Sequence, residues 1–352
     1  MVVAIEKAWL QHLHNICGRA RMSTTLPTNA LGEVVSYAPE LSVCMPVYKR
    51  PELLRRTLIS VTTSAKPFKV PIFIADDSCD ETNRSVIEEA CREYPYIFWH
   101  RNTFNLGIDR NILRCVELST CAYAWIFGED DLMEPTAIES VFELLAVSSY
   151  PFIFVNYASI SNDYKRRGRE LAIEIARDRV LTAAEFLSDY GWAAGFIGSC
   201  VVQKWRWDAV DKTRYVGTYY AHLGAIFEAS RECDVYAIAL PLVMNRAENA
   251  ASFTWANDAI SVVYGFGRLM SLLGEFYGPD VVCRARRAGY GTFKSNSLVW
   301  LMSQRAEGRY GYSEWREFVL EDTNSLFFRV CALCICFVPR KILISIKRAL
   351  GR

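Results

Sequence analysis

The amino-acid sequence predicts an α/β fold, in which a mostly parallel sheet has helices on both faces, followed by a mainly helical C-terminal region. Between residues 41 and 160, short apolar runs alternate with segments whose apolar residues recur every three or four positions. Such alternation of strands with helices indicates right-handed crossovers and a parallel sheet. After residue 160 the alternation weakens, and charged, Trp-rich and Gly-rich stretches follow. The regular part of the chain is therefore expected to form the sheet.

Five apolar runs in the first half end in turn or polar residues, which is the pattern of buried strands. They span residues 41–48, 70–78, 96–102, 122–128 and 151–159. The segments between them have one apolar face, as Leu54, Leu58 and Val61 illustrate, and are predicted to be helices. Ser78 or Asp80 can cap the second of these helices.

The chain divides into three parts by pattern. We expect a loosely attached N-terminal extension, an α/β domain with two halves, and a helical region that ends in an amphipathic basic tail. Their bounds are 1–40 for the extension, 41–160 and 161–240 for the halves of the domain 41–240, 241–352 for the helical region and 326–352 for the tail.

Composition excludes several classes of protein. The chain has 352 residues, of which 51% are hydrophobic and 22% charged, and this argues against disorder. A formal net charge of +1 argues against a nucleic-acid-binding protein with a broad basic surface. Since the first residues lack a clean apolar stretch and the cysteines are scattered, we expect a cytoplasmic protein with reduced thiols.

Four polar clusters follow the first four predicted strands. They lie at residues 46–50, 76–78, 105–111 and 128–131. Ligands of parallel α/β sheets bind beyond the carboxyl ends of the strands. The sequence therefore predicts a binding site where these clusters meet.

The last cluster contains three adjacent carboxylates, Glu129, Asp130 and Asp131. Such groups repel one another unless a cation or hydrogen-bond donors offset their charge. Oxygen ligands suit Mg²⁺ or Mn²⁺, which one or two carboxylates commonly hold together with substrate phosphates. A divalent ion would stabilise a departing diphosphate. The alternative is a solvated acidic turn that caps the helix near Pro135.

The other clusters suit a nucleotide. A carboxylate at Asp76 or Asp77 can accept from a nucleobase N–H, although it can also be an ordinary N-cap. Arg110, at a predicted helix start beside Gly107, can bind phosphate or be a charge on the helix face.

These clusters carry a family resemblance. The segments LSVCMPVYKRPELLRRTLISV, FIADDSCDET, RNTFNLGIDRN and YAWIFGEDDLMEP resemble the successive motifs of the inverting family 2 glycosyltransferases of GT-A fold. The sequence around DRNILRCVELS and WIFGEDDL is similar to that of bacterial O-antigen enzymes of the abequosyltransferase-like group. The resemblance covers residues 41–160. It implies a Rossmann-like GT-A domain that moves a sugar from a nucleotide-diphospho-sugar to a hydroxyl, with inversion.

The resemblance also implies roles for single residues around the nucleotide. Pro46, Tyr48 and Arg50 would line the nucleotide pocket. Asp77, or Asp76, would bind the base.

The remaining roles concern the phosphates, the metal and the sugar. Arg110 would lie near the phosphates or order the carboxylates, and Gly107 would belong to the nucleotide-sugar site. Residues 129–131 stand where the family has its DXD motif, so Asp131 would ligate Mg²⁺ or Mn²⁺. Glu129 and Asp130 would face the ribose and the donor sugar.

An inverting transfer needs a general base that takes the proton of the acceptor hydroxyl. The family places an acidic residue for this in the second half, often as a Glu-Asp pair. No such pair occurs between residues 180 and 240. His222 has a suitable intrinsic pKa and is the candidate base. The alternative is a structural histidine at a helix start, with Asp189 and Asp208 as further candidates.

The tail is basic and amphipathic. Residues 340–352 include five Lys or Arg and no acidic residue, and Ile342, Ile346 and Leu350 share one face. This pattern suits a helix on an anionic membrane surface, where a polyprenyl-diphosphate-linked glycan acceptor would be presented. The alternative is a terminal helix packed on the catalytic domain.

We therefore expect a metal-assisted glycosyltransferase of O-antigen or capsule synthesis, peripheral on the inner face of the cell membrane, with no nucleic-acid partner. One rival is a sugar nucleotidyltransferase, which would need a Gly-rich loop that is missing after the first strand. Another rival is a non-catalytic nucleotide-sugar-binding or scaffold protein of the same fold.

Overall fold

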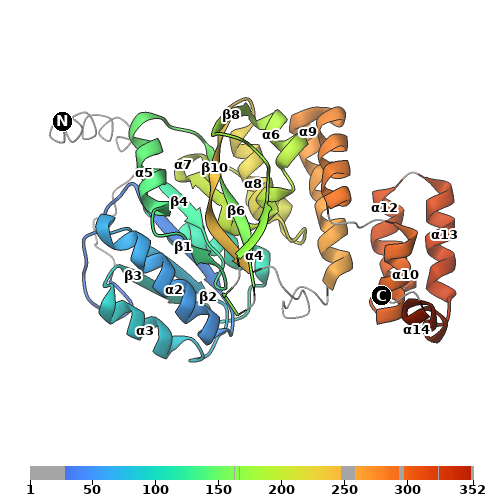
Figure 1. Cartoon of the computed structure of the whole chain (residues 1–352), viewed down its shortest axis with the longest axis horizontal. Coiled ribbons are helices and arrows are strands. Elements are labelled where there is room, and N and C mark those ends of the chain that lie inside the picture. The colour runs from blue at the N-terminus through green and yellow to red at the C-terminus, as the bar shows by residue number, and fades with distance from the viewer. Residues whose placement is uncertain are drawn as a thin grey trace.

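The computed structural model describes residues 28–161, 163–165, 167–246, 258–292, 297–323 and 325–349. Figure 1 shows an α/β domain built around one sheet, with the C-terminal helices gathered beside it. The α/β fold and the mainly helical C-terminal region that the sequence predicted are both present.

Ten strands within the described residues form one sheet, whose main path runs β3-β2-β1-β4-β9-β6-β10-β5. The first four of this path are parallel: β3 (Ile97–Arg101), β2 (Ile72–Asp76), β1 (Leu41–Val47) and β4 (Tyr123–Ile126). The rest are β9 (Cys200–Gln203), β6 (Phe152–Ile160), β10 (Asp234–Arg246), β5 (Leu132–Met133), β7 (Arg167–Leu171) and β8 (Arg179–Thr182). Beyond β4 the sheet is mixed, because β9 is antiparallel to both β4 and β6.

Six strands nevertheless end at the same edge of the sheet. Since β9 is antiparallel to both of its neighbours, β6 runs in the direction of β4, and β10 is parallel to β6. We call this the carboxyl edge, and define it by the last residues of the six strands, Val47, Asp76, Arg101, Ile126, Ile160 and Arg246.

Helices cover both faces of the sheet, as predicted. One face is covered by α2 (Pro51–Ala65), α3 (Arg84–Glu93) and α5 (Ala137–Val147). The other is covered by α4 (Ile108–Leu118), α6 (Ala183–Tyr190) and α8 (Ala221–Ser230). Strand β1 serves both cores, because Val43 and Met45 point to the first and Cys44 to the second.

Short helical turns join these elements. They are η1 (Lys66–Phe68), η2 (Ala193–Gly195), η3 (Ile197–Ser199), α7 (Lys204–Asp208) and η4 (Lys212–Tyr215).

The start of α3 differs from the prediction. Asp80 accepts a hydrogen bond from the backbone N–H of Thr82 (2.9 Å), and Ser78 accepts one from that of Lys49 (2.9 Å). The helix begins later, behind Asn83, which provides no side-chain cap. Ser78 and Asp80 therefore order the preceding turn, and the predicted capping role is wrong.

The segment before β1 is packed where it is described. The N–H of Ala30 donates to the Ile97 carbonyl at 2.8 Å, and the ring of Tyr37 meets Phe73 and Phe98 edge-on. Residues 28–40 thus belong to the body of the domain, and residues 1–27 of the predicted extension lie outside the described residues.

The C-terminal region consists of α9 (Ala259–Thr292), α10 (Leu298–Glu307), α11 (Tyr312–Glu314), η7 (Trp315–Val319), α12 (Leu320–Asp322), α13 (Leu326–Phe337) and α14 (Arg340–Ala349). Its core joins Ile260 and Tyr264 of α9 to Leu301, Val319 and Ile335. The boundary predicted at residue 240 falls inside β10, so this region begins later than expected. Across the described part of the chain, no helix is both long enough and apolar enough to span a bilayer.

Helix α9 also packs closely on the α/β domain through Gly265. A methyl group at this position would overlap the carbonyl oxygen of Thr218. We expect Gly265→Ala to lower the free energy of unfolding by about 1–3 kcal/mol in chemical denaturation, because this backbone contact must separate. Gly291 lies in the second part of α9, beyond the kink at Gly278, and has open space around it, so Gly291→Ala should be neutral or stabilising by up to about 1 kcal/mol. Equal effects of the two substitutions would contradict the close approach.

Candidate active site

The acidic cluster lies at the carboxyl edge, directly behind β4. Glu129 Oε2 accepts a hydrogen bond from the backbone N–H of Tyr48 at 2.8 Å, which joins the cluster to the loop after β1. The buried Thr57 hydroxyl lies 2.8 Å from the carbonyl oxygens of both Glu129 and Asp131. The acidic turn is therefore held by α2 and by the β1 loop, and it is not the solvated turn of the alternative interpretation.

Two arginines meet the central carboxylate of this cluster. Asp130 Oδ2 lies 3.1 Å from Arg50 Nη1 and 2.6 Å from Arg246 Nη2. Arg246 ends β10, is 5% exposed, and also donates its backbone N–H to Asp131 Oδ1 at 3.1 Å. Arg246 is a site residue that the sequence did not predict. The only signal was a cationic residue at the end of a long apolar run.

Burial dominates the electrostatics of the other two carboxylates. It raises the pKa of Glu129 to about 8, against the Tyr48 N–H and the Arg50 charge, which favour the ionised form. Burial, followed by the charge of Asp130, also raises the pKa of Asp131 well above its ordinary value, and Arg246 opposes this shift. An additional cation at Asp131 would therefore favour its ionised form.

The carboxylates of the second cluster are engaged by the protein itself. Asp76 is fully buried and accepts from the Ser78 N–H (3.0 Å), the Asn83 amide (3.1 Å) and the Trp99 indole (3.2 Å). These three donors use both of its oxygens. Asp76 therefore orders the loop after β2, and its role in binding the base stays a prediction.

Asp77 is occupied in the same way. Its carboxylate accepts from the Asn102 amide at 3.0 Å and from the backbone N–H groups of Leu106 (2.7 Å) and Gly107 (3.0 Å). It therefore fixes the loop after β3, which is the third polar cluster. Asp76 and Asp77 are both buried, and their hydrogen bonds hold the loops after β2 and β3.

The remaining nucleotide candidates are accessible. Pro46, Tyr48 and Arg50 are half-buried at the end of β1, and Gly107 and Arg110 are exposed at the start of α4. Gly107 has a φ of 77°, a left-handed conformation that favours glycine. The structure thus brings these five residues to the same edge as the acidic cluster.

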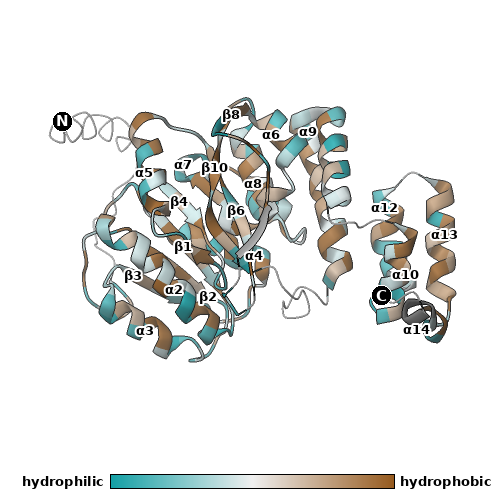
Figure 2. Cartoon of the chain, viewed as in Figure 1, coloured by the Kyte–Doolittle hydropathy of each residue, from teal (hydrophilic) through white to brown (hydrophobic). Residues whose placement is uncertain are grey.

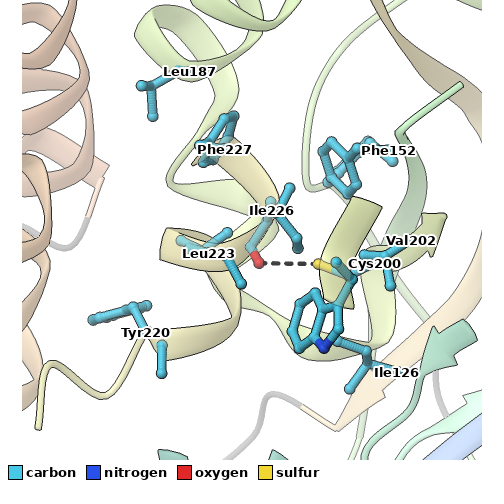
Figure 3. Close-up of a cluster of buried hydrophobic side chains, with 14 of the residues drawn as sticks. Ile126, Phe152, Leu187, Cys200, Val202, Tyr220, Leu223, Ile226 and Phe227 are labelled. Carbon is cyan, nitrogen blue, oxygen red and sulfur yellow. Dashed lines mark hydrogen bonds between the residues drawn. The ribbon is translucent and has the colours of Figure 1, made fainter. Parts of the chain in front are cut away.

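The candidate base is buried. His222 is 1% exposed and its Nε2 lies 3.3 Å from the Ala194 carbonyl oxygen, while burial lowers its pKa to about 4. Figure 3 shows the packed core next to this residue, with Tyr220 just before α8 and Leu223 in its first turn. An acceptor hydroxyl cannot reach this imidazole here. The structure supports the alternative of a structural histidine.

The two further candidates lie in exposed positions. Asp208 follows β9, whose end pairs with the beginning of β4, so it lies at the edge opposite the acidic cluster, and it forms an ion pair with Lys204. Asp189, near the end of α6, accepts from the Ser188 hydroxyl at 2.7 Å. Nothing in these contacts brings either carboxylate to the cluster.

Comparison with known proteins identifies the kind of domain to which this site belongs. Residues 42–208 match Glycosyl transferase family 2. The chain carries a family 2 glycosyltransferase domain. This domain spans β1 to α7 and so includes the acidic cluster, the loop after β1 and α2, whereas Arg246 lies beyond it. The chain is thus a glycosyltransferase that takes its sugar from a nucleotide-diphospho-sugar, as its motifs predicted.

Two known proteins are similar to this chain well beyond residues 42–208. The glycosyltransferase is 27% identical over 289 residues to the abequosyltransferase RfbV of Salmonella typhimurium. The aligned residues make up 78% of this chain and 85% of the relative. Its fold is similar to that of S. aureus TarS residues 1–349, with a TM-score of 0.58 at 8% identity over 88% of this chain and 92% of that chain. The complex of the same TarS segment with UDP-GlcNAc gives a TM-score of 0.55 at 9% identity over the same shares. At such low identity these structures show the fold alone, which is GT-A-like.

The burial of His222 has a measurable consequence. Since its pKa is about 4 in the folded state and 6.5 as a free side chain, the unfolded state binds a proton more readily between these values. Its contribution to stability is complete above pH 6.5 and is lost as the pH falls towards 4. We expect this loss to reach up to about 3 kcal/mol, measured by denaturation at several pH values. His222→Gln should remove it.

His100→Gln is the matched control, because His100 lies on the exposed side of β3. It should leave most of the pH dependence intact. A pH profile that His222→Gln leaves unchanged would contradict the buried, neutral imidazole.

Proposed function

We propose that this glycosyltransferase transfers a sugar to a hydroxyl of a glycan acceptor, with inversion, in the synthesis of a bacterial surface polysaccharide such as O-antigen or capsule. The observation that supports it most is the acidic cluster at the carboxyl edge, in which Asp130 forms ion pairs with Arg50 and Arg246. The similarity to an abequosyltransferase supports the class of product.

The donor would bind across the ends of β1 and β3. Tyr48 offers an aromatic ring and Arg50 a guanidinium on one side of this place, and Arg110 offers an exposed guanidinium on the other. Guanidinium groups suit phosphate oxygens because they donate two parallel hydrogen bonds. Pro46 and Gly107 carry no side-chain donor and leave the approach open. In this proposal backbone and aromatic groups recognise the base, since Asp76 and Asp77 are already occupied.

A divalent ion fits one residue of the cluster. Within the described residues no three His, Cys, Asp or Glu side chains form a group that could hold a metal, so the protein would supply few ligands. Mg²⁺ and Mn²⁺ accept one carboxylate together with substrate phosphates. Asp131, buried with few donors, fits that mode, and Asp130 would face the sugar. Bound there, the ion would offset the charge that develops on the departing diphosphate.

The tail would bring the enzyme to a lipid-linked acceptor, which we propose is a polyprenyl-diphosphate-linked glycan. Residues 326–352 contain no acidic residue. Figure 2 shows the hydrophobic character of α13. Its Leu326, Phe327 and Phe337 are 74%, 74% and 71% exposed. An apolar helix face beside basic residues suits the surface of an anionic bilayer.

The structure also bears on the alternative for the tail. Helix α14 packs on α10, where the Arg340 guanidinium donates to the Ala306 carbonyl oxygen. It therefore covers the helical region and leaves the α/β domain free. Ile342 is 52% exposed, whereas Leu350 and the side chain of Ile346 lie outside the described residues.

The proposed reaction is tested by a donor panel. Purified protein with Mn²⁺ or Mg²⁺ is mixed with UDP-, GDP-, CDP- and dTDP-sugars, and released nucleotide is followed with and without a membrane lipid extract. We expect metal-dependent release from one donor class. Asp131→Asn should lower kcat/KM by about 100-fold, because the carboxylate charge that would hold the ion facing the diphosphate is lost. Glu139→Gln, an exposed carboxylate on α5, is the control and should not change it.

Each other outcome identifies a rival. Donor binding without release under any acceptor condition would indicate a nucleotide-sugar-binding or scaffold protein. Formation of a nucleotide-sugar from a nucleoside triphosphate and a sugar phosphate would indicate a nucleotidyltransferase. Absence of donor binding would refute the proposed site.

Membrane contact predicts selective binding to vesicles. We expect the protein to sediment with phosphatidylglycerol-containing vesicles and to remain in solution with phosphatidylcholine alone. Phe327→Glu with Phe337→Glu should weaken binding at least about 10-fold, because each buried Phe contributes about 1.5–3 kcal/mol. Val147→Glu, which alters a residue 76% exposed on α5, should have no effect. Equal binding by all three proteins would rule out this face.

A further inference from the structure

A single carboxylate joins the two halves of the α/β domain at the carboxyl edge. Asp109, in the first turn of α4, is 6% exposed. Its Oδ2 accepts from the backbone N–H groups of Gly217 (2.7 Å) and Tyr219 (3.1 Å), and its Oδ1 accepts from that of Ala221 (3.1 Å). All three donors belong to the turn over residues 217–221, which leads into α8.

This turn has an unusual backbone conformation. Gly217 has a φ of 90° and Tyr219 a φ of 66°. A left-handed conformation is ordinary for glycine but unfavourable for tyrosine, and it persists only where surrounding contacts hold it. Asp109 bonds to the N–H of Tyr219 and to an N–H on either side of it, and the Tyr219 hydroxyl donates to Asp258 Oδ2 at 3.0 Å.

The turn places α8 against the segment that precedes β9. His222 Nε2 lies 3.3 Å from the Ala194 carbonyl oxygen, and Gly195 faces the ring of Tyr220. Strand β9 then starts beside Ile126, the last residue of β4, from which the chain continues to the acidic cluster. Asp109 thus links the helix behind the third polar cluster to the second-half segments that flank the same edge.

Only a carboxylate meets this set of donors. Three N–H groups point at its two oxygens, and an ionised carboxylate has acceptors alone. An asparagine has the same shape, but its NH₂ group would face at least one of these N–H groups. Asp109→Asn therefore weakens the hydrogen bonds to the 217–221 turn with little change in side-chain volume.

We propose that Asp109 is a positioning residue for the acceptor: it holds the 217–221 turn, and with it the half-buried Tyr219, in register with the donor side of the site. The inference rests on the proposed transferase function. It assigns the 217–221 turn to the acceptor side, because the proposed donor contacts come from the ends of β1 and β3 and from the acidic cluster. Displacing a positioned substrate by about 1 Å can cost a factor of about 100 in rate.

The test separates donor from acceptor. Asp109→Asn is assayed for nucleotide binding by calorimetry, for donor hydrolysis without acceptor, and for KM and kcat with the donor and the acceptor varied in turn. We expect the nucleotide Kd and donor KM to stay within about 2-fold, and the acceptor kcat/KM to fall about 10- to 100-fold. Glu117→Gln, at the exposed far end of α4, is the control and should match the wild type.

A second variant alters the turn without touching the carboxylate. Gly217 has open space around its Cα, so Gly217→Ala introduces backbone strain and no clash. It should reproduce the acceptor-specific loss even if Asp109→Asn fails to fold.

Two results would overturn the inference. One is an unchanged acceptor kcat/KM in both variants while the wild type is active. The other is an equal loss of donor binding, hydrolysis and transfer, which would indicate general damage to the fold. Failure of the wild type to release nucleotide from any donor would instead remove the proposed function itself.

Discussion

The contact on which the site depends is the ion pair between Asp130 and its two arginines. Three consecutive carboxylates behind a buried strand repel one another, and each loses hydration. Arg50 comes from the start of α2 and Arg246 from the end of β10, so the charge of Asp130 ties the first strand of the sheet to the last long one. Removal of these guanidinium groups would leave the charge of Asp130 without the two ion pairs that offset it.

The other carboxylates at this edge do a different kind of work. Asp76, Asp77 and Asp109 are each buried and each accept three hydrogen bonds, most of them from backbone N–H groups of loops. Hydrogen bonds to a charged acceptor are stronger than neutral ones, so they can hold irregular loops in one conformation. The loops after β2 and β3 and the turn before α8 are thereby made rigid around the site.

Sequence patterns predicted the first half of this fold because its signals are local. Leu54, Leu58 and Val61 repeat with the period of a helix, and the strand runs are continuous apolar stretches that a parallel sheet buries on both faces. The same reasoning failed where long-range contacts decide. Nothing local shows that β9 reverses the sheet direction, or that Arg246, more than a hundred residues away, reaches Asp130.

The roles of single carboxylates were the hardest to predict, because an aspartate at a strand end has the same sequence signature whether it binds a ligand or a loop. The difference is the number of protein donors around it. Both carboxylate oxygens of Asp76 and of Asp77 accept hydrogen bonds, whereas within the described residues the carboxylate of Asp131 accepts one, from the Arg246 N–H. Burial then raises the pKa of Asp131, and its charge remains to be balanced. In the proposed reaction, a cation shared with donor phosphates would balance this charge, which is the reason we assign the metal to Asp131 and not to Asp76 or Asp77.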